Sequence, residues 1–414
     1  MSPRSFAAVL LLLAPSLAGA STLCVNPGGT GGCFAAIQLA VNAAHRGDAI
    51  AIAAGTYAEH VAIGAKATLQ IQGAGAGSTF VDGGGSGTVL TLNGPSTSVL
   101  IGGITLQNGT RGVEVGEHVR FTLEDSAAVG NVGQSGINVE PHALVAVTRC
   151  TISGNSATDF GGGIGAQSVS GGARVTVTAS TISNNSSDGS GGGIFSSGLL
   201  KVVDSTVSGN TTHVFGGGIY GGNMTITGST ISGNSAQNGG GIAVPGFTAI
   251  QAKISNSTVS GNSAAQSAGG ILAVRGTQLD HVTVANNSAG TVGGGIGTSF
   301  FQAKAVKLTA SLIADNTAPN GNNCGGLTIR GISGNLVEGP LDECTISNIG
   351  GAILLSGDPL LGPLQNNGGS TDTQALGPGS PAIAVLTKLS ACRQPDQRGV
   401  ARSVPCDVGA FEAP

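Results

Sequence analysis

Three side chains that could carry acid–base or metal chemistry occur at nearly the same place in a repeated phrase. Asp159 lies four residues after one asparagine of the repeat, Asp188 three after the next, and His213 three after the one that follows. Phe160 and Phe215 each lie five residues after such an asparagine. If successive repeats stack, a carboxylate–imidazole group stands beside aromatic rings, which could bind a sugar or a metal. The alternative is that these are exposed, variable bend residues without a role.

Two further places hold groups that could do chemistry. Asp280 and His281 precede one copy of the repeat on an expected strand, where alternation leaves one of the two outside. A surface charge pair is the alternative to a site there. In the C-terminal region Arg398 is expected to pair with Asp407 or Glu412 and to hold a loop-rich module together. Its alternative role is to line a ligand site.

The elements that must position these side chains form a repeat. Between residues 147 and 316 one phrase, typically Ser-Thr-aliphatic-Ser-Gly-Asn, occurs seven times, with its centres 24 to 30 residues apart. The aliphatic centres are Ile152, Ile182, Val207, Ile231, Val259, Val284 and Ile313. Another aliphatic residue precedes each centre by five residues, an asparagine follows it by three, and a Gly-Gly-aliphatic step closes six copies. A period of this length is the signature of a solenoid.

The composition of the repeat predicts strands, because Ser, Thr, Asn, Gly and β-branched residues favour strands and turns over helices. We therefore expect an all-β, single-stranded parallel β-helix of roughly eleven turns from residue 34 to about 350, with three short strands in each turn. Equivalent residues would form columns about 4.8 Å apart along the axis, with the aliphatic columns inside. The asparagine column would occupy a tight bend, in left-handed conformation, with its amides bonded to neighbouring turns.

Both ends of such a solenoid need caps. The segment from Phe34 to Ala44 has apolar residues at helical spacing, which predicts an amphipathic helix that closes the N-terminal end. Residues 1–20 have the features of a secretory signal, with Arg4 before an apolar run and Ala18-Gly19-Ala20 at the cleavage site. The mature chain would then begin near Ser21.

Export permits disulfides, and proximity along the chain pairs six of the seven cysteines. The expected bridges are Cys24–Cys33, Cys324–Cys344 and Cys392–Cys406, which would staple the two ends, although sequence alone does not fix the connectivity. Cys150 occupies a column otherwise filled by serine. We expect it to be a tolerated small residue and not a reactive thiol, because nothing near it in the sequence would lower its pKa.

Charge excludes one class of partner. The net charge is −4, only 9% of residues are charged, and no basic stripe exists, so nucleic acid is not an expected partner. No segment of the mature chain is long and apolar enough to span a bilayer. We expect a monomer that is secreted or held at the cell surface, with a polysaccharide or a surface protein as its partner. No cofactor is expected, and the sequence does not decide whether a metal is bound.

The segment from Cys24 to Leu92 resembles the N-terminal turns of right-handed β-helix proteins of the pectin-lyase-like superfamily. The stretches of sequence that carry the resemblance include Phe34-Ala35-Ala36-Ile37-Gln38 and Gly55-Thr56-Tyr57-Ala58-Glu59. The alternation of the repeated phrase with Gly-Gly-Gly-Ile is similar to the repeats of polymorphic outer-membrane proteins. These resemblances imply a right-handed β-helix and a bacterial exported protein.

The C-terminal region resembles the choice-of-anchor Q type region of bacterial surface proteins. The resemblance lies in phrases such as Gly379-Ser380-Pro381-Ala382-Ile383 and Asp407-Val408-Gly409-Ala410-Phe411-Glu412. That family usually continues the first phrase with Asp, whereas this chain has Ala384. The expected division is a signal peptide at 1–20, a capped β-helix at 21–350 and a C-terminal module at 351–414, docked on the end of the solenoid.

Three functions fit these observations. Many right-handed β-helices are polysaccharide lyases, hydrolases or esterases, but the carboxylate clusters and phrases that those chemistries need do not occur here. The first hypothesis is therefore a non-catalytic, adhesin-like protein that binds glycans or proteins. A polysaccharide lyase or hydrolase with an unrecognised site is the second, and a structural surface spacer is the third. The uniform repeats would build a groove only at the bends from 159 to 215 and in the less regular turns before 145.

Overall fold

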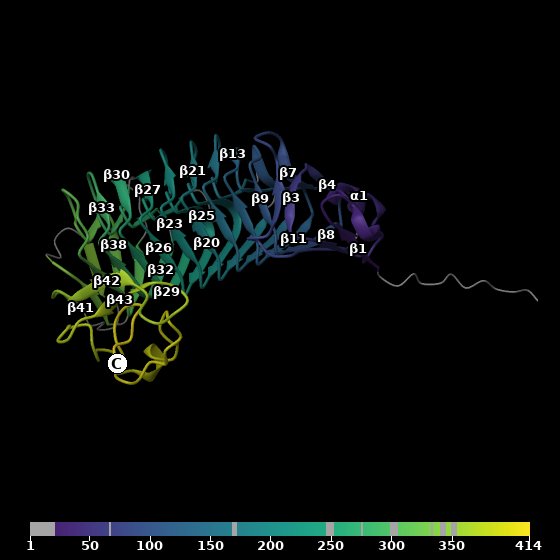
Figure 1. Cartoon of the computed structure of the whole chain (residues 1–414). Helices are drawn as coiled ribbons and strands as arrows, with labels where there is room; N and C mark the ends of the chain where they lie inside the picture. The colour runs from purple at the N-terminus through teal and green to yellow at the C-terminus, as the bar shows by residue number, and fades with distance from the viewer. Residues whose placement is uncertain are drawn as a thin grey trace, which may run out of the picture.

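The computed structural model describes residues 21–65, 68–167, 172–245, 252–274, 276–298, 305–332, 334–339, 345–348 and 354–414. Within these residues the chain winds as a long solenoid of stacked turns built from parallel strands (Figure 1). The predicted all-β solenoid is confirmed. The signal peptide expected at 1–20 lies outside the described residues.

Successive turns contribute strands to three long parallel ladders, which we call A, B and C. Ladder A contains β1 (Thr22–Val25), β2 (Ala49–Ile52), β5 (Leu69–Gly73), β8 (Ser98–Gly102), β11 (Arg120–Glu124), β15 (Leu144–Thr148), β19 (Arg174–Thr178), β22 (Ile194–Val203), β25 (Ile219–Thr227), β29 (Ala252–Ser260), β32 (Thr277–Ala285), β35 (Val306–Thr309), β38 (Thr328–Gly331) and β40 (Thr345–Asn348). Ladder B contains β3 (Gly55–Ala58), β6 (Thr79–Asp82), β9 (Thr105–Gln107), β12 (Ala127–Val129), β16 (Thr151–Ser153), β20 (Thr181–Ser183), β23 (Thr206–Ser208), β26 (Thr230–Ser232), the second parts of β29 and β32, β36 (Leu312–Ala314), β39 (Asn335–Val337) and β41 (Leu354–Leu355).

Ladder C contains β4 (Val61–Ile63), β7 (Thr88–Leu92), β10 (Arg111–Val115), β14 (Ile137–Val139), β18 (Ile164–Ala166), the first parts of β22 and β25, β28 (Ile242–Val244), β31 (Ile271–Ala273), β34 (Ile296–Gly297) and β37 (Cys324–Gly325). A shorter ladder D, between B and C, contains β13 (Val132–Gly133), β17 (Ser156–Ala157), β21 (Ser186–Ser187), β24 (Thr211–Thr212), β27 (Ser235–Asn238), β30 (Ser263–Ser267) and β33 (Ser288–Ala289). One turn of the chain therefore passes through A, B, D and C in that order.

The core is a set of aliphatic columns. In β19 the side chains of Val175 and Val177 are buried, whereas Thr176 between them is partly exposed, as the period of two in a strand requires. The repeat centres pair in register along ladder B, for example Ile182 with Val207. The aliphatic residues five positions earlier stack in ladder A, and those of the Gly-Gly-aliphatic steps stack in ladder C. All three predicted columns are confirmed.

The asparagine column forms a continuous row of side-chain amides inside the solenoid. The row consists of Asn131, Asn155, Asn185, Asn210, Asn234, Asn262, Asn287 and Asn316, all buried. In a typical link, Asn210 Nδ2 donates to Asn234 Oδ1 at 2.9 Å and to Ile182 O in the preceding turn at 2.9 Å. The backbone N–H of Asn210 donates to the same Asn234 oxygen at 2.9 Å. Each amide therefore joins three successive turns.

One detail of that prediction is wrong: the row asparagines do not adopt the left-handed conformation. The residue before each of them does, with Gly154, Gly209 and Gly233 at φ of 62–64°. In other turns the same place is taken by Asn184 and Asn286. The left-handed residue turns the chain, which leaves the following asparagine free to point inward and bond along the axis.

A second row lies at the corner between ladders A and B. Ser180 N donates to Ser205 Oγ at 3.1 Å, and Ser205 N donates to Ser229 Oγ at 3.2 Å. Cys150 continues this row, and its N–H donates to Ser180 Oγ at 3.0 Å. The Cys150 thiol is free and buried, and burial raises its pKa to about 11. This agrees with the expected unreactive small residue, since the nucleophile would be the thiolate.

The N-terminal cap is present but shorter than expected. Helix α1 (Ile37–Ala43) buries Ile37, Ala40 and Val41, whereas Phe34 lies in an extended bridge to Val25. At the start of this helix, the backbone N–H groups of Ile37 and Gln38 donate to the Glu59 carboxylate at 2.8 and 2.9 Å. The Cys24–Cys33 disulfide ties the segment before the helix, which includes a 3₁₀ turn at Thr30–Gly32, to the first strand.

The C-terminal module, residues 356–414, packs along the flank of the solenoid and not over its end (Figure 1). It contains the antiparallel pair β42 (Leu361–Gln365) and β43 (Thr373–Leu376) and a 3₁₀ turn at Leu389–Ala391. It covers outward-facing threonines of ladder B. Gln397 accepts from Thr258 Oγ1 at 2.7 Å and donates to Thr230 Oγ1 at 2.9 Å, and Ala410 N donates to Thr283 Oγ1 at 3.0 Å. The domain boundary at 350 stays a prediction.

Two of the expected disulfides are confirmed, Cys24–Cys33 and Cys392–Cys406. The third, between Cys324 and Cys344, involves a residue outside the described ones and stays a prediction. Among the described residues, no helix has the length and apolar character needed to cross a membrane.

The asparagine row predicts a specific loss of stability. Asn234→Ala removes the acceptor of two Asn210 N–H groups and the amide that bonds Val207 O and Asn262. Unsatisfied buried polar groups cost about 1–3 kcal/mol each, so we expect a loss of roughly 3 kcal/mol in the free energy of unfolding. Urea unfolding monitored by circular dichroism measures it. Asn223→Ala, at an exposed position of β25, is the control, and equal losses in the two variants would contradict the structural role of the row.

Candidate functional site

The outward face of ladder C is the part of the surface where the repeat departs most from uniformity. One outward residue in each turn stands between two buried inward residues, and these outward residues pair in register. From the N-terminal side they are Glu114, Asn138, Gly165, Phe195, Tyr220, Ala243 and Leu272. The face therefore changes along the axis from polar to aromatic residues and ends at the aliphatic Ala243 and Leu272, which are buried.

The polar end is a network of charged and amide groups. Arg111 pairs with Glu114, and their side chains are only 21% and 15% exposed. Asn138 Nδ2 donates to both Glu114 carboxylate oxygens at 3.2 Å and to Glu140 Oε1 at 3.1 Å. Burial raises the pKa of Glu114 and the Glu140 carboxylate adds to the rise, while the Arg111 charge opposes it. Arg111 Nε is buried and has no hydrogen-bond partner among the described residues.

A cleft of about 190 Å³ opens beside this network. Its lining includes Arg111, Gln134, Asn138, Asp159, Phe160 and Gln167. Gly165 forms part of the wall, where a Cβ atom would lie 2.4 Å from Ser135 Oγ and 2.7 Å from Phe160 O. Only glycine fits that position, because the chain segments that carry Ser135 and Phe160 approach its backbone so closely. The cleft thus offers amide, guanidinium and carboxylate groups next to an aromatic ring.

An aromatic row continues from the cleft along ladder C. The rings of Phe160 and Phe195 lie 4.7 Å apart between centroids, and those of Phe195 and Tyr220 are stacked at 5.1 Å with an interplanar angle of 3°. Tyr220 and Phe215 pack against a small apolar cluster that includes Leu272. Phe160, Phe215 and Tyr220 remain partly exposed, whereas Phe195 is buried at 8%. Burial also raises the pKa of the Tyr220 hydroxyl.

The structure distributes the sequence-predicted residues over this region. Asp159 and Phe160 line the cleft, and Phe215 belongs to the aromatic row. Asp188 and His213 occupy exposed bends on adjacent turns, since Ser187 and Thr212 before them pair in ladder D. In the described chain no hydrogen bond or ion pair joins Asp159, Asp188 and His213. A site formed by these three groups therefore stays a prediction.

Sequence reasoning missed Glu114, Asn138, Phe195 and Tyr220. Their place in the sequence could have identified them as outward residues of ladder C, because each directly follows an inward aliphatic residue of that ladder, as Phe195 follows Ile194. Such outward residues do not repeat in type, so they leave no periodic pattern. The expectation that a groove could form in the turns before 145 agrees with the location of Arg111, Gln134 and Asn138.

The two other candidate places lie at a corner of the solenoid and in the C-terminal module. His281 is buried at 4%, adopts φ of 53° at the corner between ladders A and B, and its Nδ1 lies 2.9 Å from Asp280 Oδ1. Arg398 is structural as expected, but its carboxylate partner is Asp396, at 2.7 Å, because Glu412 pairs with Arg402 at 3.1 Å. The Arg398 guanidinium also lies 3.7 Å above the Phe411 ring.

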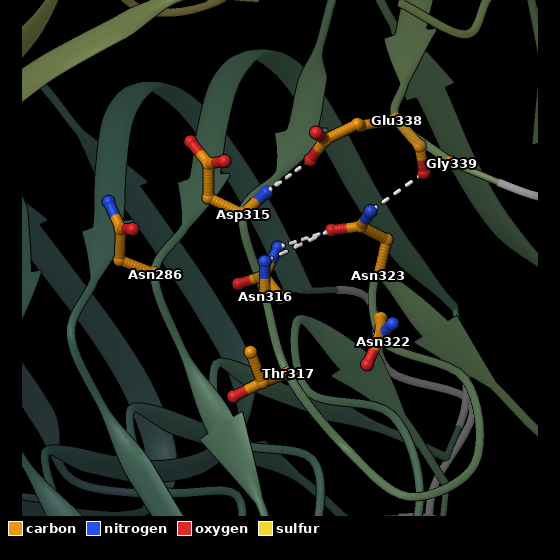
Figure 2. Close-up of a pocket in the computed structure, with 8 residues that line it drawn as sticks. All are labelled: Asn286, Asp315, Asn316, Thr317, Asn322, Asn323, Glu338 and Gly339. Carbon is orange, nitrogen blue, oxygen red and sulfur yellow. Dashed lines mark hydrogen bonds between the residues drawn. The ribbon is translucent and has the colours of Figure 1, made fainter. Parts of the chain in front are cut away.

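A larger cavity of about 460 Å³ lies where the asparagine row ends (Figure 2). Asn316 Nδ2 donates to Asn323 Oδ1 at 2.8 Å, and Asn323 Nδ2 donates to Glu338 O at 2.7 Å. The Asp315 N–H donates to Glu338 Oε2 at 2.6 Å, which holds two carboxylates near one another. Partial burial raises the pKa of Asp315, and the charges of Glu338 and Asp358 raise it further.

One comparison with known proteins, the match to a family model, bears on the fold. Residues 161–289 match the family model described as a right handed beta helix region, so the predicted handedness is confirmed. A pectin methylesterase from carrot is 15% identical, with a TM-score of 0.40 over 62% of this chain and 87% of that one. The pectate lyase Pel9A is 14% identical, with a TM-score of 0.49 over 95% and 96% of the two chains. A comparison with curated proteins finds no match. The resemblances to anchor-type regions and outer-membrane repeats stay predictions.

The acidic cavity predicts a pH-dependent gain from one substitution. Asp315 adopts φ of 54°, a place that Asn286 occupies in the preceding turn. Asp315→Asn ends the repulsion from Glu338 and Asp358, and Asn tolerates the same left-handed backbone, so the bend is kept. We expect the melting temperature near pH 7 to rise by about 1–2 °C, kept small by solvent screening.

The sign of the pH dependence follows from the raised pKa. The Asp315 carboxyl has its ordinary value of 3.8 when unfolded and a higher one when folded, so the native chain loses stability as pH rises through that window. The gain from Asp315→Asn should therefore be complete above the window and vanish below about pH 4. Melting curves from about pH 3 to 8 measure this. Asp188→Asn, in an exposed bend, serves as the control, and a gain that persists at about pH 3 would contradict the electrostatic cause.

Proposed function

We propose that the protein is an exported, non-catalytic polysaccharide-binding protein, and that a glycan chain lies along the outward face of ladder C. The observation that carries the proposal is the partly exposed aromatic row that starts at the polar cleft, with Phe160 belonging to both. The C–H faces of sugar rings pack on aromatic side chains, while sugar hydroxyls need hydrogen-bonding groups close by. The face of ladder C supplies both in succession.

The polar cleft would fix the orientation of the chain. Gln134, Asn138 and Gln167 carry amides that can donate to and accept from hydroxyl groups. Arg111 Nε, buried without a partner among the described residues, offers one more donor at the cleft wall. Because strands of ladder C run in register on successive turns, these groups and the aromatic row form a track across the turns, which suits an extended polymer better than a small ligand.

Two observations support an extracellular location. The disulfides Cys24–Cys33 and Cys392–Cys406 form in oxidising compartments. The expected signal peptide at 1–20 would direct the chain there.

The binding proposal predicts the effect of losing one ring. Tyr220→Ala removes the stacked partner of Phe195 and part of the apolar floor, so we expect polysaccharide affinity to fall roughly tenfold, equivalent to about 1.4 kcal/mol. Affinity electrophoresis against a panel of neutral and acidic polysaccharides, followed by titration of the best binder, measures it. Leu199→Ala is the control, because Leu199 is also exposed, at 37%, but lies in ladder A. Loss of affinity in Leu199→Ala and not in Tyr220→Ala would place the binding surface elsewhere.

A second candidate function is hydrolysis of the bound glycan, favoured by the Glu114 and Glu140 carboxyls. Two carboxyls close together, one with a raised pKa, are the groups that a glycosidase uses as general acid and base. In this account Glu114 in its protonated form gives a proton to the glycosidic oxygen. The engagement of both carboxyls by Asn138 fits a structural network equally well, so turnover decides between the two functions.

Hydrolysis predicts a distinctive pH profile. Release of reducing ends from the bound polysaccharide should fall as pH rises through the raised pKa of Glu114, because the carboxyl loses the proton that it must donate. Glu114→Gln should reduce the rate by about 10²–10⁴-fold. Asp372→Asn, an exposed carboxyl in the C-terminal module, is the control. If the polysaccharide binds with an affinity that depends on Tyr220 and no reducing ends are released, the non-catalytic function is retained. Product release that is unchanged in Glu114→Gln would exclude this carboxyl as the acid.

A further inference from the structure

Glu117, His118 and His142 bring three metal-ligand groups together on two successive turns, outside the candidate site. Glu117 and His118 lie in the corner between β10 and β11, and His142 lies in the corner between β14 and β15. The two corners are neighbours because β10 pairs with β14 and β11 pairs with β15. One ligand atom from each of the three residues lies within 4.8 Å of the other two.

The backbone conformation fixes the positions of the Cα atoms that carry the two imidazole side chains. His118 and His142 both have φ near 60°, at 62° and 60°, and each begins the bend into a ladder A strand. His118 N donates to Pro141 O at 3.4 Å, which ties the corners together. The rings are stacked with centroids 4.8 Å apart and an interplanar angle of 3°. The spacing of the turns thus sets the spacing of the two rings.

The distances suit a tetrahedral ion. Zinc binds imidazole nitrogen at about 2.0–2.1 Å and carboxylate oxygen at about 2.0–2.2 Å, so two of its ligand atoms stand roughly 3.4 Å apart. His118 Nε2 lies 3.5 Å from Glu117 Oε1. An imidazole nitrogen binds a metal in the plane of its ring, so the two stacked rings must turn toward a common point to share one ion. All three side chains are exposed, which leaves room for that rotation.

We infer that Glu117, His118 and His142 bind one divalent cation of the zinc type across two turns of the solenoid. Two imidazoles and one carboxylate are donors that transition ions prefer over calcium or magnesium, which take oxygen ligands. The neighbouring carboxyl Glu140 is held by Asn138 at 3.1 Å, so it does not complete the set. The fourth position faces solvent and stays open to water or to an oxygen ligand.

Zinc titration of the tag-free chain tests this inference. Isothermal titration calorimetry with a zinc salt should show one ion per chain, with no comparable binding of calcium or magnesium. His118→Asn and His142→Asn should each weaken zinc binding by about tenfold or more, because one of three ligands is lost. Asn is chosen because it tolerates the left-handed backbone, so the bend is kept. Cobalt added in place of zinc should give the visible absorption of a tetrahedral ion in the native chain, and both variants should lose it.

The control is His45→Asn, which removes an exposed histidine outside the cluster and should bind zinc as the native chain does. Far-ultraviolet circular dichroism and the melting temperature without metal confirm that each variant folds. The inference is overturned if the native chain binds no zinc, if both cluster variants bind as tightly as the native chain, or if His45→Asn loses as much affinity as they do. Because ligand binding raises stability, the native melting temperature should also rise with zinc concentration.

Discussion

The structure depends on satisfying buried polar groups at every bend. A solenoid must turn several times in each coil, and each tight turn places backbone N–H and C=O groups inside, away from water. The asparagine row answers this at one corner, because a carboxamide has both donors and an acceptor and can bond the turns before and after it. The serine row does the same at the corner between ladders A and B. The aliphatic columns can stack only because these corners hold the turns in register.

This regularity also limits where function can reside. The inward positions are committed to the core and the corners to their hydrogen-bonded rows, so variation is free mainly on outward strand residues and in the longer bends. Ladder B uses its outward threonines to receive the C-terminal module. In ladder C the outward residues Glu114, Asn138 and Tyr220 remain partly exposed, and the residue type changes along the ladder to the buried Leu272. The candidate site and the proposed metal cluster both lie where the repeat is least uniform.

The periodic part of the molecule was predictable from the sequence because a column along the axis appears in the chain as a repeat. Ile182 and Val207 could be assigned to neighbouring turns from spacing alone, and the structure pairs them. Tyr220 could not be placed in the same way, since its column contains a different residue type in each turn. The flank docking of the C-terminal module was also hidden, because Thr206, partly exposed, and Thr230, covered, look identical in sequence. The position of the left-handed residue was mistaken for the same reason, as Asn184 and Asn185 stand side by side and only one points inward.

The asparagine row has an electrical consequence. Along the row every side chain donates to the next asparagine toward the C-terminal end and accepts from the turn before it, as Asn131 donates to Asn155 and Asn287 to Asn316. Only the second N–H of each amide turns back, to a carbonyl of the preceding turn. Their carboxamide dipoles therefore point the same way and polarise one another along the solenoid axis. The positive end of this aligned row reaches Asn323, at the cavity that holds the Asp315 and Glu338 carboxylates (Figure 2). The solenoid thus carries a directional field inside an otherwise weakly charged chain.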